Sequence, residues 1–285
     1  MIYPLVILAV LCMSLSSILV RFSTAPPAVI AFFRLAMTAL IGAGLGVGAG
    51  QLASITKKHL AAAIGAGFFL SLHFGFWITS LSYTSIASSV LFTNLQVIFV
   101  WLFSVLFLKE KVSRLAAGGI IIALAGSIFI GGGDFFSGHL LGDMISLASG
   151  LFVAIYMLIG RKIRGSVDIW PYTTVVSAAA ACFLGLYAIL NDLAFTSYPA
   201  LDYLLFGLMA LIPGIGGHAI LNWALKYLKA PLVAVAILGE SVGAAVLGYL
   251  IFHESLAWFQ VAGGALVLTG IYMALFRASE ESQTA

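Results

Sequence analysis

One carboxyl group in a long apolar stretch is the side chain best placed to do chemistry. Glu240 lies about nine residues into the apolar run 231–252, roughly 13 Å along a helix that rises 1.5 Å per residue. That depth is near the middle of a bilayer, where ionisable side chains are costly and are functional candidates. A low dielectric disfavours the charged form, so we expect Glu240 to exchange a proton or to pair with a solute ammonium group. The alternative is a carboxylate tied to a neighbouring helix by hydrogen bonds.

Other polar side chains recur at helical spacing inside apolar runs. Ser89, Thr93 and Gln96 follow at i, i+4 and i+7 and form one stripe, from which Asn94 points away. Two further runs each carry a histidine with a large or polar side chain four residues later. Such stripes line cavities or join helices through hydrogen bonds. The substrate-binding residues we expect are Glu240, Gln96, Thr93, Ser89, His73, Trp77, His218, Asn222, Tyr156 and Ser14, with Ser17 as a weaker candidate.

Several other features favour a structural role. Arg34 lies about two turns inside its apolar run and is expected to reach outward to water or to pair with a carboxylate. Pro213-Gly214 and Gly216-Gly217 interrupt another run, as a static kink or as a hinge. No cysteine and histidine set has the spacing of a metal site, so neither a metal nor a cofactor is expected.

The elements that position these residues must be membrane-spanning helices. Of the 285 residues, 62% are hydrophobic and 8% charged, whereas soluble domains carry about 25% charged residues. The mean hydropathy is +1.16. These values exclude a cytosolic enzyme, a nucleic-acid-binding protein, a disordered chain and a secreted disulfide scaffold. Cys12 and Cys182 lie inside apolar runs, which gives no sign of a disulfide framework.

Ten apolar runs are long enough to cross a bilayer, which takes about 20 residues in a helix. Proline, charged and polar clusters separate them. The expected spans are residues 3–20, 27–48, 59–82, 86–108, 112–131, 141–160, 170–190, 203–225, 231–252 and 257–276, followed by a short polar tail. This count leaves no room for a soluble domain.

Loop charges predict the orientation of these spans. Cytoplasmic loops carry an excess of lysine and arginine. With the N-terminus inside, Arg21 is the only such residue outside, at the end of a helix. We therefore expect both termini in the cytoplasm of a bacterial-type inner membrane. The cytoplasmic side then holds Lys57, Lys58, Lys109, Lys111, Arg114, Arg161, Lys162, Arg164, Lys226, Lys229 and Arg277, whereas the carboxylates of Asp134, Asp192, Asp202 and Glu254 lie outside.

The second half of the chain repeats the first. A shift of 144 residues aligns the halves without a gap from Pro27 onward, and it places Gln96 on Glu240. Five helices per unit is an odd number, so the two units must have opposite orientations in the membrane. The expected units are 1–135 and 136–276, with a cytoplasmic tail at 277–285. The matching pairs are Pro27 and Pro171, Tyr83 and Tyr227, Leu81 and Leu225, Glu110 and Glu254, Gly119 and Gly263, and Gly126 and Gly270.

Inverted repeats are the architecture of many secondary transporters, whose substrate site lies near mid-membrane between the repeats. The alternative is a duplicated helical bundle without a transport role. Channels need rings of charge or carbonyl filters, and membrane enzymes need clustered nucleophiles, bases or metal ligands. The sequence shows none of these.

The ends of the two halves share one pattern. In residues 83–129 and 227–271, one helix closes on a glutamate, Glu110 or Glu254, and a glycine-rich helix follows with a second glycine seven residues on. With this pattern, each half resembles an EamA-type unit of the drug/metabolite transporter superfamily. Gly142-Asp143, which opens the second half, and Arg34 also fit the family pattern. The resemblance implies ten helices, a central cavity and transport of small metabolites, often export of amino acids or related compounds.

The sequence therefore predicts an all-α membrane protein of ten helices in two inverted repeats. Its expected function is secondary transport by alternating access, exporting a small amphipathic metabolite, an amino acid or an amine, with possible proton coupling through Glu240. A non-coupled facilitator or exchanger is the alternative. Phosphorylated cargo would call for intramembrane lysine or arginine, and only Arg34 is available. The expected partners are the solute and membrane lipids, without nucleic acid, and the oligomeric state stays open.

Overall fold

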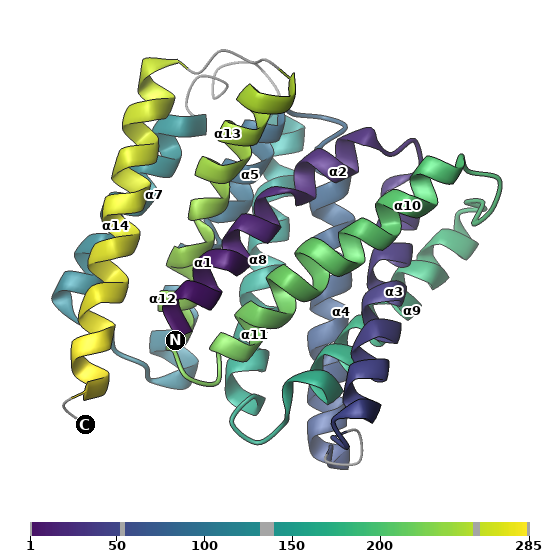
Figure 1. Ribbon diagram of the computed structural model, residues 1–285, viewed down its shortest axis with the longest axis horizontal. Helices are drawn as coiled ribbons and strands as arrows, with labels where there is room; N and C mark the ends of the chain where they lie inside the picture. The colour runs from purple at the N-terminus through teal and green to yellow at the C-terminus, as the bar shows by residue number, and fades with distance from the viewer. Residues whose placement is uncertain (1, 52–54, 132–139, 253–256, 284–285) are drawn as a thin grey trace.

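The computed structural model describes residues 2–51, 55–131, 140–252 and 257–283. The first half begins with a span made of two helices and ends with α7 (Figure 1). Its elements are α1 (Ile2–Ser14), α2 (Ser16–Phe22), α3 (Pro27–Gly48), α4 (Lys57–Ser80), α5 (Ile86–Asn94), α6 (Gln96–Phe103), the π-helix η2 (Ser104–Leu108) and α7 (Arg114–Gly131). Asp134, Glu254 and the expected boundary between the two units lie outside the described residues.

The second half has the same succession of spans. Its elements are α8 (Leu140–Ile163), α9 (Ile169–Leu190), α10 (Ala200–Met209), the π-helix η4 (Ala210–Ala219), α11 (Ile220–Ala224), α12 (Ala230–Ile237), α13 (Gly239–Phe252) and α14 (Trp258–Gln283). Nine of the spans in the described part of the chain are long and apolar enough to cross a membrane, and the shorter apolar helix Arg114–Ile130 stands at the fifth predicted span, 112–131. The prediction of an all-α protein with many membrane-spanning helices is confirmed. The helix α14 continues through most of the expected polar tail.

Local sequence signals explain where several helices begin and end. Pro27 occupies the first turn of α3, where its missing N–H costs nothing. The side chains of Thr56 and Ser85 accept hydrogen bonds from the backbone of the following turn and so cap α4 and α5. Lys109 takes a left-handed conformation, with φ of 55°, directly after η2. These signals place the turns at the two ends of the bundle.

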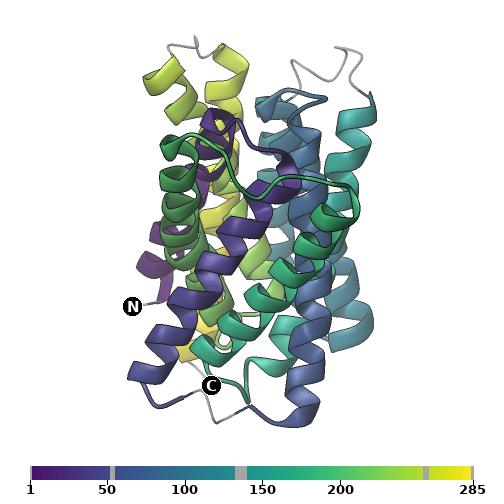
Figure 2. The same ribbon diagram turned by 90° about the vertical axis from the view of Figure 1, so that its right-hand side faces the viewer.

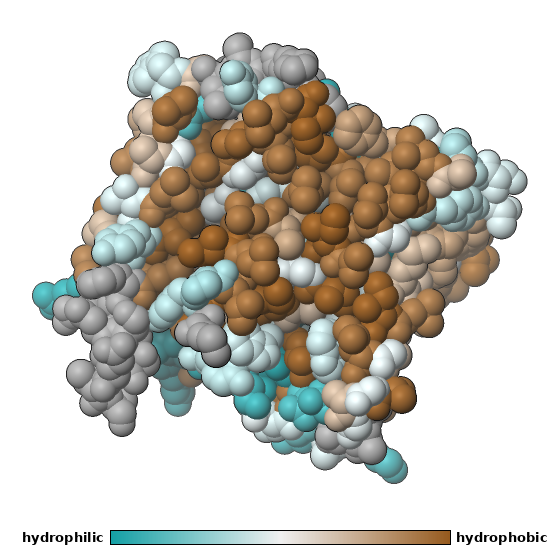
Figure 3. All heavy atoms as spheres, viewed as in Figure 1, coloured by the Kyte–Doolittle hydropathy of each residue, from teal (hydrophilic) through white to brown (hydrophobic). Residues whose placement is uncertain are grey.

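Large apolar side chains cover the outside of the bundle. Leu40, Phe107 and Leu190 are 73%, 72% and 73% exposed. Figure 3 shows a hydrophobic surface across the middle of the molecule, with hydrophilic residues gathered toward its edges. Soluble monomers rarely expose apolar patches of this extent, so this surface fits contact with lipid tails.

Spans from the two halves pack against each other. The helix α7 lies along α14, α3 along α9, and α4 along α8, while α1 crosses η4 (Figures 1 and 2). The 144-residue shift maps α3 onto α9, α7 onto α14 and α4 onto the span that contains η4. A shift of about 140 residues maps α1 and α2 onto α8. A twofold relation between the halves requires such pairings. They support the inverted repeat, which stays a prediction.

Four glycines bring α7 and α14 into close contact. A methyl group added at Gly119 would stand 2.6 Å from the carbonyl oxygen of Gly270, and one at Gly126 would stand 2.5 Å from that of Gly263. Small residues at a helix crossing let two backbones approach within van der Waals distance. The contact between the last helices of the two halves therefore leaves no room for a side chain.

Three spans are interrupted at a leucine. Leu15 separates α1 from α2, Leu95 separates α5 from α6, and Leu238 separates α12 from α13. The Leu238 N–H bonds three residues back, to the Val235 oxygen at 3.1 Å, which is the tighter 3₁₀ pattern. Each interruption is followed within two residues by a polar side chain of the central cavity, namely Ser16, Gln96 and Glu240.

The predicted interruption of the eighth span is the π-helix η4, which contains Pro213. Its glycines serve close packing: a methyl group at Gly214 would stand 2.6 Å from the Thr38 hydroxyl, and one at Gly217 would stand 2.6 Å from the Met13 side chain. The wide turn places His218 at the end of the π-helical stretch, beside the central cavity.

Candidate functional site

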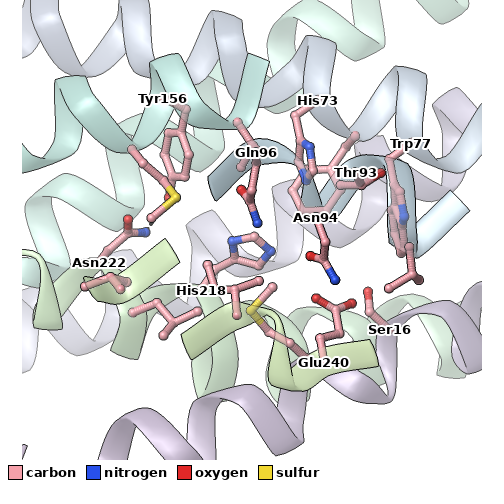
Figure 4. A pocket seen from close by; sticks show the side chains of 18 of the residues that line it. Ser16, His73, Trp77, Thr93, Asn94, Gln96, Tyr156, His218, Asn222 and Glu240 are labelled. Atoms are coloured by element: carbon pink, nitrogen blue, oxygen red, sulfur yellow. Dashed lines mark hydrogen bonds between the residues drawn. The ribbon is translucent and has the colours of Figure 1, made fainter. Parts of the chain in front are cut away.

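A narrow polar cavity lies between the two halves of the chain. Side chains from α4, α5 and α6 of the first half face side chains from α8, α11 and α13 of the second (Figure 4). The space that the centre of a water molecule can enter is about 40 Å³, enough for a few water molecules. Its polar lining consists of Ser16, His73, Trp77, Thr93, Asn94, Gln96, Tyr156, His218, Asn222 and Glu240, and apolar side chains such as Met13, Val90, Met157, Leu221 and Ile237 complete the wall.

Glu240 supplies the carboxylate of this cavity. The residue is 8% exposed and lies in the first turn of α13. Figure 4 shows its carboxylate facing the Asn94 amide and the Ser16 side chain. The Asn94 amide donates a hydrogen bond to the Ser241 hydroxyl at 2.8 Å, which fixes Asn94 beside α13. The surroundings of the carboxylate are therefore polar side chains from both halves.

Two histidines stand in the middle of the cavity. The His73 Nδ1 lies 2.8 Å from the Ser149 hydroxyl and 3.2 Å from the Ser149 carbonyl oxygen, so this ring is tied to α8. Its ring is stacked with that of Trp77, with 6.5 Å between the centroids, and lies 6.5 Å from the His218 ring. His73 thus combines the two roles that the sequence left open, an interhelical hydrogen bond and a place in the cavity wall.

A second pair closes the far side of the cavity. The Asn222 amide donates a hydrogen bond to the Tyr156 hydroxyl, and both side chains are buried. The bond joins α11 to α8 and leaves the two polar groups facing the cavity (Figure 4). Donors and acceptors thus lie opposite the Glu240 carboxylate.

The structure brings eight of the ten predicted binding residues to this cavity and places Ser14 and Ser89 elsewhere. The Ser14 hydroxyl bonds to the Val10 carbonyl at 3.0 Å in its own helix. Ser89 and Ser80 share a hydrogen bond of 2.7 Å between their hydroxyl groups. Both hydroxyls are therefore satisfied by helix-to-helix or intrahelical bonds.

Two lining residues were missed by the sequence pattern. Asn94, expected to point away, faces the cavity, and Ser16 was not a candidate. Each lies next to a helix interruption, Leu95 or Leu15, where the regular 3.6-residue spacing breaks down. A polar residue beside a helix interruption would have indicated a lining residue. None of the patterns found in the sequence predicts these interruptions.

Arg34 differs from both expectations. It is 1% exposed, so it does not reach water, and none of the described carboxylates lies within ion-pair distance of it. Its Nη1 donates to the Ser16 hydroxyl at 2.6 Å, and its guanidinium lies 4.3 Å from the centre of the Phe74 ring. A cation is therefore held inside the bundle, one hydroxyl group away from the cavity.

An ion pair and hydrogen bonds join the helix ends on the side of the bundle that holds the expected cytoplasmic loops. Glu110 accepts a hydrogen bond of 2.6 Å from the Arg161 Nε and another of 3.1 Å from the Ala230 N–H. Arg161 also donates to the Leu225 carbonyl at 2.6 Å. We call this group of Glu110, Arg161, Leu225 and Ala230 the end clamp. It joins the ends of four spans.

The opposite end of the bundle is more open. A cavity of about 550 Å³ for water centres lies there, with Ser82, Thr84 and Ser85 in its wall. Asp143 accepts hydrogen bonds from Thr84 and Ser88 at 2.9 and 2.7 Å, and so fixes the turn before α5 to α8. Trp77 in the wall of the central cavity and Ile78 in the wall of the wide space are neighbours near the end of α4.

The sequence matches the EamA-like transporter family over residues 1–132 and 140–276. Solute carrier family 35 member G1 of Mus musculus is 28% identical over 236 residues, which are 76% of this chain. That match spans 61% of the mouse protein's length. An uncharacterized transporter of Archaeoglobus fulgidus is 24% identical over 225 residues, covering 75% of each chain.

Further matches agree with this assignment. The uncharacterized transporter YcxC of Bacillus subtilis is 24% identical over 218 residues, 70% of this chain and 68% of its own. A solved crystal structure of another protein superposes with a TM-score of 0.81, covering 97% of this chain and 98% of the other. The identity there is 18%, so that likeness concerns the fold. The chain belongs to the EamA-like transporter family, within the drug/metabolite transporter superfamily.

Proposed function

We propose that the chain is a secondary transporter that moves a small amphipathic metabolite, an amino acid or an amine, across the membrane by alternating access. The observation that carries this proposal is the narrow polar cavity between the halves, lined by Glu240 and by side chains of both units. Intramembrane ionisable residues facing a cavity mark substrate or proton pathways. Glu240 is the residue we propose for coupling to protons or for binding a solute ammonium group.

The helix interruptions support a binding role for this cavity. Discontinuous helices at mid-membrane are typical of transporter substrate sites between inverted repeats. Leu95 and Leu238 interrupt two spans beside Gln96 and Glu240, the pair that the 144-residue shift relates. We therefore propose two inverted units, 1–135 and 136–276, that meet at the cavity.

The two ends of the bundle support alternating access. The end clamp closes one end, while the other holds the wide cavity. With the termini in the cytoplasm, as the loop charges predict, this conformation is closed on the cytoplasmic side. Export through a bacterial-type inner membrane then requires the clamp to open for loading. A small central cavity fits an empty carrier whose side chains move apart when a solute binds.

The test is transport by purified protein in liposomes. A panel of labelled amino acids and amines is offered with and without an imposed pH gradient, to the native chain and to Glu240→Gln. We expect the gradient to drive uptake by the native chain, and the variant to keep exchange but to lose the response to the gradient. The reason is that an amide of the same shape cannot take up or release the proton.

The matched control is Asp143→Asn, which makes the same change in a buried carboxylate that does not line the cavity. It should keep the response to the gradient. If Glu240→Gln and the native chain behave alike, Glu240 is structural and the carrier is a facilitator or exchanger. If no solute on the panel enters, transport of amino acids and amines is wrong.

A further inference from the structure

Arg34 is a buried cation with an unused hydrogen-bonding group. Its Nη2 has no hydrogen-bond partner among the described residues, whereas its Nη1 bonds to Ser16. Glu240 is the opposite charge that acts on Arg34 electrostatically, but the described residues hold no ion pair between the two. A buried donor without an acceptor is costly. A guanidinium also carries donors only, so an unused nitrogen can be satisfied only by an acceptor. The Arg34 Nη2 is thus a buried donor for which the described residues supply no acceptor.

The other buried arginine shows what a satisfied guanidinium looks like in this chain. Arg164 is also 1% exposed. Its Nε donates to the Asn222 carbonyl at 3.1 Å, and its Nη1 donates to the Val167 carbonyl. Backbone carbonyls therefore take its protons and fix the turn after α8. Burial as such does not distinguish Arg34, but the missing acceptor does.

A second small cavity lies at Arg34. It has room for about one water molecule, with about 20 Å³ open to water centres. Thr173 lines it, and the Thr173 hydroxyl also lacks a hydrogen-bond partner in the described part of the chain. Ser177 adds another hydroxyl to the wall, while the Thr38 hydroxyl there already donates to the Arg34 carbonyl oxygen at 2.8 Å. Hydroxyls and a guanidinium together form a site rich in donors, which suits an anion.

The Arg34 cavity and the central cavity share a wall. Phe74, Tyr156, His218 and Asn222 line both. Glu240 lies on the other side of this wall. A solute that touches both charged groups must therefore displace a shared ring such as Phe74 or His218. The two spaces then form one site with a cation at one end and a carboxylate at the other.

We propose that Arg34 binds the carboxylate of the transported solute, so that the solute is a zwitterion of the α-amino acid kind and not a simple amine. The planar fork of a guanidinium matches a carboxylate and binds it through two parallel hydrogen bonds. The inference rests on the proposed transport function and narrows it, because it requires both charges on one solute. The apolar part of the central lining, such as Met157 and Ile237, favours an apolar side chain on that solute.

The test uses matched sets of solutes that differ in one charge. Leucine is compared with leucinamide and 3-methylbutylamine, which lack the carboxylate, and phenylalanine with its amide and phenethylamine. Binding to the purified full chain is measured by the shift in melting temperature, and transport is measured separately in liposomes. We expect the native chain to bind the amino acids about tenfold more tightly than the amides, because a charged hydrogen-bonded pair is lost.

The variants are Arg34→Lys and Arg34→Gln, with Arg164→Lys as the matched control. Arg34→Gln should bind amino acid and amide within about threefold of each other, and Arg34→Lys should fall between it and the native chain. Arg164→Lys should keep the native preference. Should the Arg34 variants fail to fold, Thr173→Val tests the same cavity without removing the charge, and it should weaken amino acid binding alone.

Each outcome decides the inference. Equal binding of amino acids and amides by the native chain overturns it, and this measurement needs no variant. A melting temperature that rises with chloride in the native chain and not in Arg34→Lys, with no discrimination among the organic solutes, assigns the site to an inorganic anion instead. Transport of amines and amino acids at equal rates refutes the carboxylate site and leaves the transport function intact. Selective binding without transport supports the site and refutes the transport function.

Discussion

Hydrogen bonds between cavity side chains fix the wall before any solute arrives. Asn222 is held by Tyr156 on the neighbouring helix, and Asn94 by Ser241. A buried amide that loses its hydrogen-bond partner must bear the cost of its own desolvation. Asn94 and Asn222 are therefore constrained in position and do not swing freely into the cavity.

Tyr156→Phe tests this constraint. The change removes the hydroxyl that accepts the Asn222 bond and leaves the rest of the ring in place. We expect a loss of about 1–3 kcal/mol in stability, measured as a lower melting temperature, and a higher KM for the transported solute. Tyr198→Phe is the control, since the Tyr198 hydroxyl bonds to the Ala194 carbonyl at the exposed end of the bundle. Equal effects of the two substitutions would contradict the argument.

Helical periodicity selected several of the predicted binding residues, and it does not place all of them correctly. Thr93 and Gln96 lie on the predicted stripe and reach the cavity. Ser89, on the same stripe, is held by Ser80 instead. Asn94 lies next to the interruption at Leu95, which turns its side chain into the cavity. Sequence spacing determines the helix face on which a side chain lies. The packing of the helices determines what that face contacts.

The crossing of helix α7 with α14 allows a specific prediction, because two adjacent glycines of α7 have different surroundings there. A methyl group at Gly119 would meet the Gly270 carbonyl, while one at Gly118 would meet nothing within 4 Å. We expect Gly119→Ala to destabilise the chain by about 1–3 kcal/mol, the usual cost of overpacking. Gly118→Ala should be neutral or slightly stabilising, since alanine favours helix.

Thermal unfolding in detergent compares the two substitutions. A drop in melting temperature for both would mean that helix α7 is sensitive throughout and that the close crossing is not the cause. A drop for neither would mean that α14 moves aside at little cost. Only a drop confined to Gly119→Ala agrees with the described contact.

Span number and span limits are predictable because apolar length, proline and charge determine them locally. Pro27 begins α3, and the charged cluster around Lys109 and Arg114 separates η2 from α7. The interruptions at Leu15, Leu95 and Leu238 are not predictable in this way, because leucine is a good helix former. Neither proline nor charge lies directly beside them, so a local pattern does not place them.

For the molecule as a whole, we expect the end clamp to control whether water and solutes reach the central cavity from the clamped end. Arg161→Gln removes the ion pair with Glu110 and the bond to the Leu225 carbonyl. We expect the clamped end to open more often, by about fivefold if about 1 kcal/mol is lost. The readout is the labelling rate of a single cysteine at Val233, in the cavity wall, by a membrane-impermeant maleimide.

The background for this experiment is Cys12→Ser with Cys182→Ser, because both native thiols are free. Lys162→Gln is the matched control, since Lys162 is exposed and stands beside Arg161 in α8. The control should label at the rate of the parent chain. Faster labelling in both variants would point to loss of positive charge in general, and unchanged labelling in Arg161→Gln would show that the clamp does not limit access.

The contact between α7 and α14 also bears on how such a chain can change over generations. Gly119 and Gly270, like Gly126 and Gly263, are neighbours in space although they are encoded far apart. A larger residue at one position is tolerated only if the opposite helix turns or recedes, which calls for a compensating change in the other half of the gene. Two halves joined in this way are expected to drift together, so a recombinant that combines the first half of one relative with the second half of another inherits a mismatched crossing.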